Sequence, residues 1–310
     1  MAPSIPVDRQ FDFRDADFTR VRKMIHARAG SSLGAHKREM VYSRLARRLR
    51  ALGRQDFASY LDQLENEPDA AEWEDFVNAL TTNLTAFFRE SHHFPILADF
   101  AQKRGGPVSV WCCAASTGEE PYSIAITLAE ALGPRASACS VLATDIDTNV
   151  LNRARTAVYP AERVAKMEES RLKRFFLKGR GANAGQVRVR PEIADMVRYE
   201  TLNLLAPSWP ISEKLDVIFC RNVMIYFDKP TQAKILERFV PLLKPGGLLV
   251  LGYNDTPERA PFPVHIDALG LFTPFVPPIA GVEQPRHPMR DKYHHVFVFA
   301  RRREPDAITA

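Results

Sequence analysis

Acidic side chains follow two apolar runs of this chain, at points where a parallel sheet would bring them together. Glu120 comes just after the run 108–113 and a single glycine, Gly118, and Asp145 ends a second run, 141–144. Ligands of α/β proteins bind at the carboxyl ends of parallel strands. A carboxylate there can accept hydrogen bonds from ribose hydroxyls. The pattern predicts a site for a nucleoside-containing ligand; the alternative is a doubly wound domain in which Asp145 only caps a loop.

The glycine content of the first turn indicates which nucleoside-containing ligand is favoured. A dinucleotide fingerprint has three glycines that let the pyrophosphate approach the backbone, and this turn has one. S-adenosylmethionine has adenine and ribose, but a sulfonium and an amino acid in place of phosphates. Acidic residues at the helix start, Glu119 and Glu120, are compatible with it. The turn therefore favours S-adenosylmethionine over a dinucleotide.

Strands and helices alternate around these residues. Apolar residues at helical spacing predict a helix over 119–132, and the pair Asp147-Thr148 predicts the start of another, over 149–159. Strands are expected at 196–202, 215–220, 248–252 and 293–300, with a helix after Asp228. The order predicts an α/β fold with a doubly wound, Rossmann-like parallel sheet.

Other segments divide the chain into domains. Residues 11–90 show helical stripes and predict a separate helical bundle, followed by an α/β domain over 91–300 and a tail, 301–310. Residues 81–95 are polar and aromatic, so we expect an ordered junction that leads directly into the first strand. A glycine-rich stretch before alternating valines and arginines predicts a small inserted antiparallel β-subdomain over 178–191.

Composition narrows the class of protein. The chain has 310 residues, of which 45% are apolar and 25% charged, as in globular proteins. No run approaches a membrane span and the start lacks a signal-peptide core, so we expect a cytoplasmic protein without membrane insertion. The four cysteines are expected to be reduced core residues. The pairs His92-His93 and His294-His295 would point to opposite faces of a strand, so no metal site is predicted.

Positive charge is concentrated in one segment, Lys37 to Arg54, which has seven basic residues against the single acid Glu39. Apolar residues at helical spacing occupy one stripe of it, so the basic side chains project from other faces. An acidic partner is indicated, although a solvated charged face is the ordinary alternative. The candidates for substrate recognition are Lys37, Arg44, Arg47 and Arg48.

Long motifs of the chain resemble one known family, the CheR chemotaxis receptor methyltransferases, from about residue 20 to residue 252. The matching strings are HKREMVYSRLARRLRALG, ALTTNLTAFFRESHHFPIL, AASTGEEPYSIAITLAE, ATDIDTNVL, LNLL and LDVIFCRNVMIYFDK. The resemblance implies a helical N-terminal domain, an S-adenosylmethionine-binding α/β domain and an inserted β-subdomain. This is the order expected from the residues.

The resemblance also implies site residues. Those expected to line the cofactor pocket are Asn83, Thr85, Arg89, Glu120, Asp145, Asn203, Leu204, Arg221 and Asn222. Asp145 would bind ribose, Asn203 the adenine edge, and Arg89, Glu120 and Asn222 the methionine end; packing alone is the alternative for Arg221. Arg89 and Tyr226 would be catalytic, with a purely structural Tyr226 as the alternative.

The activity implied by the resemblance is transfer of a methyl group from S-adenosylmethionine to glutamate side chains on the cytoplasmic helices of chemoreceptors, leaving S-adenosylhomocysteine. A receptor C-terminal peptide could dock on the β-subdomain, and we expect a monomer. Two other functions stay open. One is a non-catalytic, cofactor-binding receptor partner. The other is a nucleic-acid methyltransferase, although the Asp/Asn-Pro-Pro-aromatic turn typical of amino-methylating enzymes is replaced here by Arg221-Asn222-Val223-Met224, so no nucleic-acid partner is expected.

The resemblance weakens after Gly252. Family members usually continue with a turn like Gly-His-Ser-Glu-Asn-Phe and a closing hairpin, whereas this chain has Tyr253-Asn254-Asp255-Thr256 and a proline-rich segment. The last strands of the sheet have therefore been replaced, or the reading frame changes there. The resemblance therefore does not assign the last strands of the sheet, but no predicted pocket residue lies beyond Tyr226.

Overall fold

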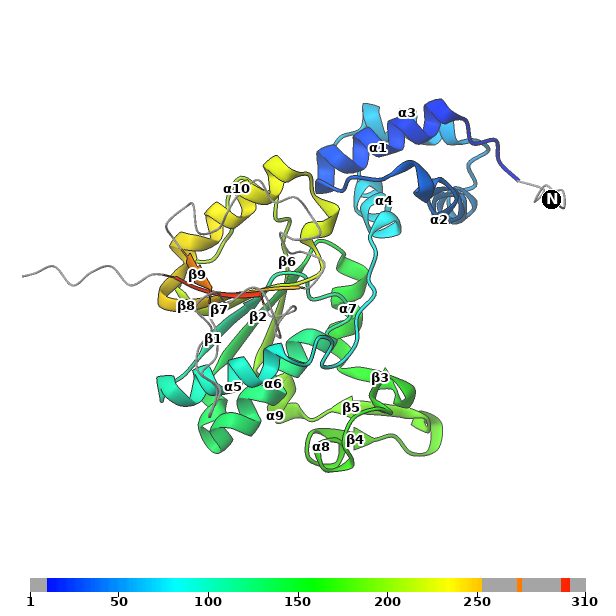
Figure 1. Ribbon diagram of the computed structural model, residues 1–310. Helices are drawn as coiled ribbons and strands as arrows, with labels where there is room; N and C mark the ends of the chain where they lie inside the picture. Colours follow the sequence, from blue (N-terminus) through cyan, green and yellow to red (C-terminus); the bar gives the residue numbers. More distant parts are fainter. Residues whose placement is uncertain (1–9, 253–271, 275–296, 302–310) are drawn as a thin grey trace, which may run out of the picture. The chain divides into compact units, whose positions relative to one another are not determined.

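The computed structural model describes residues 10–252, 272–274 and 297–301 (Figure 1). The chain divides into two compact units, Met1–Thr82 and Asn83–Ala310. The division lies before the expected boundary at residue 90, because the contacts of residues 83–90 are made within the second unit. The Asn83 amide donates to Asp147 at 2.7 Å, and the Phe88 N–H donates to the Ser123 hydroxyl at 2.9 Å.

The first unit is helical, as predicted. Its helices are α1 (Asp15–Ala29), α2 (Arg38–Ala51), α3 (Phe57–Asn66) and α4 (Glu72–Leu80). The buried side chains are the apolar stripes seen in the sequence, including Val21 of α1, Leu45 of α2 and Phe76 of α4. Helix α1 ends where Gly30 adopts a left-handed conformation, with φ at 68°.

The second unit is built on a seven-stranded sheet in the order β6-β2-β1-β7-β8-β10-β9. Neighbouring strands from β6 to β8 are parallel, and β10 runs antiparallel between β8 and β9. The doubly wound sheet is therefore confirmed. The strands are β1 (Ser109–Cys112), β2 (Ser140–Asp145), β6 (Val197–Thr201), β7 (Leu215–Cys220), β8 (Leu243–Leu251), β9 (Phe272–Pro274) and β10 (Phe297–Arg301).

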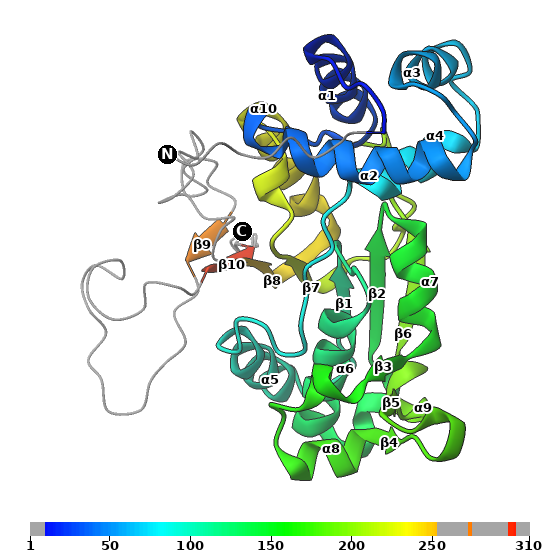
Figure 2. The ribbon, with the colours of Figure 1, turned by 90° about the vertical axis from the view of Figure 1, so that its right-hand side faces the viewer.

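Helices cover both faces of this sheet. Alternate residues in and just after β1 show the two layers: Val110 and Cys112 pack into the core beneath α5 and α6, while Trp111 and Cys113 pack into the core beneath α10. Figures 1 and 2 show α5 and α6 on one side of the sheet and α10 on the other. The helices are α5 (His93–Arg104), α6 (Glu119–Leu132), α7 (Thr148–Thr156), α8 (Glu169–Phe175), α9 (Pro191–Ala194) and α10 (Lys229–Phe239).

Several elements differ from the sequence-based expectation. Residues 81–95 do not lead directly into the first strand, because α5 intervenes, and His92-His93 begin this helix instead of lying on a strand. Helix α7 ends at Thr156 because Ala157 is left-handed, with φ at 56°. The end of the sheet is closed by β10 and by β9, which was not predicted. Residues 293–296 of the predicted final strand lie outside the described residues.

The inserted β-subdomain has three antiparallel strands in the order β3-β5-β4. Strands β4 (Phe176–Lys178) and β5 (Gln186–Val189) form a hairpin whose loop and second strand lie in the predicted segment 178–191, while β4 begins before it. Strand β3 (Val158–Pro160) pairs with the other side of β5. The subdomain thus begins well before residue 178. The sequence reading missed β3 because it continued α7 through these residues.

All four cysteines are free and buried, as predicted. None of the helices in the described parts of the chain is long and apolar enough to cross a membrane.

Candidate functional site

Asp145 lies at the carboxyl end of β2, at the edge of the sheet where the first turn also arrives. Its carboxylate accepts the Ser116 N–H at 2.8 Å and the Asp147 N–H at 3.0 Å. Removal from bulk water raises the pKa of Asp145 to about 6, and these two hydrogen bonds offset part of the rise. The group is an acceptor whose charge changes near neutrality.

Gly118 closes the turn between β1 and α6, and it is required there for two reasons. Its φ is 96°, which favours glycine, and a Cβ atom would lie 2.6 Å from the Tyr159 hydroxyl and 2.8 Å from the Tyr199 hydroxyl. Tyr159, from β3, also donates to the Thr117 carbonyl at 2.7 Å. The glycine therefore serves close packing against tyrosines, and its Cα is not open to a pyrophosphate.

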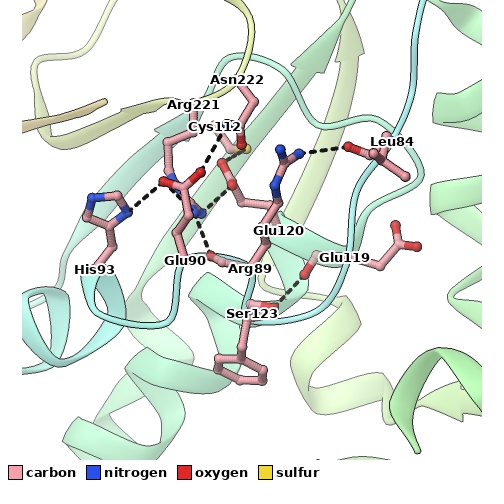
Figure 3. Close-up of polar contacts among 11 residues, drawn as sticks. Leu84, Arg89, Glu90, His93, Cys112, Glu119, Glu120, Ser123, Arg221 and Asn222 are labelled. Carbon is pink, nitrogen blue, oxygen red and sulfur yellow. Dashed lines mark hydrogen bonds and ion pairs between the residues drawn. The ribbon is translucent and has the colours of Figure 1, made fainter. Parts of the chain in front are cut away.

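Buried charged side chains converge beside this turn, at the end of β7 (Figure 3). The Arg221 guanidinium, with 0% of its side chain exposed, lies 2.5 Å from a Glu120 oxygen and 3.4 Å from a Glu90 oxygen. The other Glu120 oxygen accepts from the Cys112 thiol at 3.4 Å, and the Asn222 amide donates to Glu90 at 3.0 Å. One buried cation thus holds two carboxylates from separate segments.

Burial sets the protonation of this cluster. It raises the pKa of Glu120, and the Arg221 charge opposes the rise. The neighbouring His93, which is 0% exposed, has its pKa lowered to about 2, by burial first and by the Arg221 cation second. His93 is therefore a neutral imidazole at any ordinary pH, and Arg221 is the cation of the cluster.

The junction residues surround the same end of the sheet. Asn83 accepts the Ser116 hydroxyl at its carbonyl, 3.1 Å away, in addition to its amide contact with Asp147. The Thr85 carbonyl accepts from Arg163 at 3.1 Å. Arg89 donates from its guanidinium to the Leu84 carbonyl at 2.9 Å. These contacts place Asn83 at the edge that carries Asp145. The Arg89 carbonyl accepts from Arg221 at the end of β7, while the contact of Thr85 is with Arg163 and not with a strand end.

The remaining predicted pocket residues follow β6 and β7. The Asn203 side-chain oxygen accepts the Leu205 N–H at 2.9 Å, which forms a local turn, and the Leu204 carbonyl accepts from Arg238 at 3.2 Å. Tyr226 ends a short 3-10 helix, Met224–Tyr226, and is half-buried. Asn203 and Asn222 therefore come from strand ends, while the Asn203 oxygen is already used within its own loop.

Arg48 and Arg44, two of the basic candidates in the first unit, contact residues in or next to α4. Arg48 forms ion pairs with Glu72 and Asp75, and its Nε donates to Glu72 at 2.7 Å. Arg44 donates to the Thr81 carbonyl just beyond α4. Arg47 is exposed and donates only locally, to the Ser43 carbonyl at 3.4 Å. Lys37 ends a short 3-10 helix, Ala35–Lys37, before α2.

The sequence argument against a metal at His92-His93 was wrong in its geometry, because these residues begin a helix. Ligand atoms of Glu90, His92 and His93 lie within 4.8 Å of one another. The Glu90 carboxylate, however, already contacts the Arg221 guanidinium and the Asn222 amide. A metal ion would have to compete with a buried cation for its only anionic ligand.

Comparison with known proteins decides the family. A family model described as the SAM-binding domain of CheR methyltransferase matches residues 83–262, and a model of the all-alpha domain of CheR methyltransferase matches residues 16–81. The chain belongs to the CheR methyltransferase family. S-adenosylmethionine is accordingly its cofactor, and the fold is that of the family.

Named relatives agree with this assignment. The chain is 60% identical to the chemotaxis protein methyltransferase of Klebsiella aerogenes over 241 residues, which cover 78% of this chain and 83% of the relative. It is 54% identical to the chemotaxis protein methyltransferase of Escherichia coli (strain K12), covering 78% and 84%. It is 53% identical to chemotaxis protein methyltransferase 2 of Pseudomonas aeruginosa, covering 80% and 89%.

The residues at the sheet edge fit this CheR cofactor chemically. The buried carboxylate of Glu120 suits a ligand that carries a sulfonium and an ammonium group, and Asp145 suits ribose. Sequence reasoning missed Glu90, although it is adjacent to Arg89 in the junction motif. The signal was an acid beside a predicted catalytic arginine, but its partner Arg221 is distant in the chain.

Proposed function

We propose that this chain methylates glutamate side chains on the cytoplasmic helices of chemoreceptors, giving glutamate methyl esters. The observation that carries the proposal is the match to both CheR family models together with identities of 53–60% to proteins named chemotaxis protein methyltransferase. The chain covers more than four fifths of those relatives. The reaction at glutamate oxygen, and the receptor helices as partners, belong to the proposal.

Methyl transfer to a glutamate carboxylate needs no acid–base catalysis to activate the acceptor. A glutamate side chain has a reference pKa of about 4.3 and is ionised near neutrality, so the acceptor needs no general base. The cofactor supplies a methyl group on an electrophilic sulfonium. The protein's task is to hold the acceptor oxygen in line with that methyl group in a site from which water is excluded.

Individual residues have proposed roles in this task. Asp145 accepts hydrogen bonds from ribose, and Asn203 with the Leu204 backbone binds the adenine edge. Arg89 and Tyr226 orient the incoming carboxylate, by charge and by a hydrogen bond respectively. Five further residues are proposed to position the junction, the turn before α6 and the methionine end of the cofactor: Asn83, Thr85, Glu120, Arg221 and Asn222. The full burial of Arg221 favours a positioning role for it over direct contact with the cofactor.

The test is direct. Purified protein is incubated with methyl-labelled S-adenosylmethionine and a chemoreceptor cytoplasmic fragment, and volatile label is measured after mild alkali, which cleaves methyl esters. A fragment whose methylation-site glutamates are replaced by alanine serves as the control substrate. Base-labile label on the parent fragment alone supports the proposal. Tight S-adenosylhomocysteine binding without any transfer would support the non-catalytic alternative, and alkali-stable label would exclude an ester.

A further inference from the structure

Glu90 is not among the residues assigned a role above, yet it contacts both polar residues at the end of β7. One carboxylate oxygen accepts the Asn222 amide at 3.0 Å, and the other lies 3.4 Å from the Arg221 guanidinium. Its side chain is only 15% exposed. Figure 3 shows the Glu90 carboxylate between His93 on one side and Arg221 and Asn222 on the other. The junction is thus fastened to the sheet through Glu90.

Arg221 also holds the residue before Glu90. Arg221 donates a hydrogen bond to the Arg89 main-chain carbonyl at 2.5 Å. The Arg89–Glu90 peptide is therefore held at two points. Arg221 binds the Arg89 carbonyl, and Arg221 and Asn222 bind the Glu90 side chain. Among the described residues, the Arg89 guanidinium donates its hydrogen bond to the Leu84 carbonyl. The direction of the Arg89 side chain depends on the backbone of residues 89 and 90, which the Glu90 contacts hold in place.

Backbone conformation shows that this arrangement is held under strain. Among the described residues other than glycine, five have positive φ, and four of them lie in the junction, in the turn after β1 or directly after β7: Phe88 at 53°, Glu90 at 51°, Ser116 at 48° and Asn222 at 58°. Such conformations cost on the order of 1–3 kcal/mol each for most residues and persist where the surroundings determine them. The Glu90–Asn222 hydrogen bond joins two of the four, so its loss would let both segments relax.

From these contacts we infer that Glu90 is a positioning residue for methyl transfer: it holds the Arg89 backbone against the carboxyl end of β7, so that the Arg89 guanidinium points at the acceptor carboxylate. The inference rests on the proposed function and goes beyond it, because Glu90 itself touches neither cofactor nor acceptor. Misplacement of a catalytic group by about 1 Å can cost about a hundredfold in rate. Removal of Glu90 should therefore appear in kcat.

Three variants test the inference in the full chain. Glu90→Gln retains an acceptor for Asn222 but removes the charge that faces Arg221, and Glu90→Ala removes both. Glu169→Gln neutralises an exposed glutamate that forms an ion pair with Lys173 on the same helix, at 2.6 Å, and is the matched control. For each variant, we would measure kcat and the KM values for S-adenosylmethionine and for a receptor fragment, at a temperature well below the melting temperature of the variant. Calorimetry gives the S-adenosylhomocysteine affinity.

We expect kcat to fall about tenfold in Glu90→Gln and about a hundredfold in Glu90→Ala, with both KM values and the S-adenosylhomocysteine affinity within about threefold of the parent. Glu169→Gln should match the parent. If Glu90→Ala does not fold, the isosteric glutamine variant decides the question.

Two results would overturn the inference. An unchanged kcat in folded Glu90→Gln would make Glu90 a structural residue only. A large loss of S-adenosylhomocysteine affinity would make it a cofactor ligand. Absence of ester formation by the parent protein would instead refute the proposed function, so the two failures are distinguishable.

Discussion

The raised pKa of Asp145 predicts that cofactor affinity depends on pH. If the ribose hydroxyls donate to Asp145, the cofactor binds the ionised carboxylate. With a pKa of about 6 in the unliganded protein, that form is nearly complete at pH 8 and about a tenth of the population at pH 5. We expect S-adenosylhomocysteine affinity to be constant above pH 7 and to fall up to about tenfold per pH unit below pH 6.

Folding has the opposite pH dependence at this residue. The folded-state pKa lies above the ordinary value of 3.8, so the folded, unliganded protein retains a proton that the unfolded chain has lost. The contribution of Asp145 to stability is therefore complete below pH 3.8 and is lost as the pH rises through 6. Cofactor binding reverses this, because it favours the anion. Proton release on binding is the expected consequence between pH 5 and pH 7.

Asp145→Asn separates this residue from other titrating groups. The asparagine resembles the protonated carboxyl, and a lost hydrogen bond to a charged group is worth about 1.5–3 kcal/mol, or roughly 10- to 150-fold in affinity. The variant should bind S-adenosylhomocysteine that much more weakly than the parent at pH 8, and the difference should shrink toward pH 5.

Calorimetry at four pH values, in buffers of different ionisation enthalpy, measures both the affinity and the protons released. Asp195→Asn, at an exposed position, is the control. A variant that binds as tightly as the parent at pH 8, or that retains the parent's pH dependence, would refute the assignment of Asp145 to ribose.

Three further predictions concern the turn, the basic helix and the β-subdomain. Gly118→Ala places a Cβ atom 2.6 Å from the Tyr159 hydroxyl at a φ of 96°, so it should lower both the melting temperature and cofactor affinity; a variant that melts and binds like the parent would contradict this packing. Arg47→Glu should reduce receptor methylation several-fold at low salt, with a smaller effect at high salt, and leave the melting temperature unchanged. Arg48→Glu should instead destabilise the protein, since it faces Glu72 and Asp75; equal thermal melting of the two variants would argue against this distinction. Finally, a receptor tail peptide should add a strand at β3 or β4, the outer strands of the β-subdomain, and calorimetry that detects no binding while receptor fragments are still methylated would remove this docking role.

Local signals in the sequence were sufficient for the elements that form the cofactor edge. Helix α6 and strand β7 have the predicted bounds because Gly118 marks the start of one and an unbroken apolar run marks the other. Asp147 and Asp228 cap α7 and α10 with their side chains, as expected. In contrast, α5 starts at His93, and its N-cap residue, His92, makes no side-chain cap hydrogen bond, which explains why the helix was missed.

Pairings between distant residues could not be read from the sequence. The resemblance placed Glu120 and Arg221 in one pocket, but nothing local shows that Arg221 also contacts Glu90, which is far from it in the chain. The basic segment had the same limitation. Its charge pattern indicated an acidic partner, and for Arg48 the acids Glu72 and Asp75 lie within the same helical unit.

The position of β10 in the sheet has a consequence for synthesis of the protein. Strand β10 pairs with residues 248–251 of β8, all of them buried, but it is translated well after them. Since ribosomes add about 5–20 residues per second, β8 waits several seconds with an apolar, unpaired edge. Such an edge can recruit a strand from another nascent chain. Truncation before residue 297 should therefore leave the residues of the cofactor edge in place and make the protein aggregate more readily than the full chain.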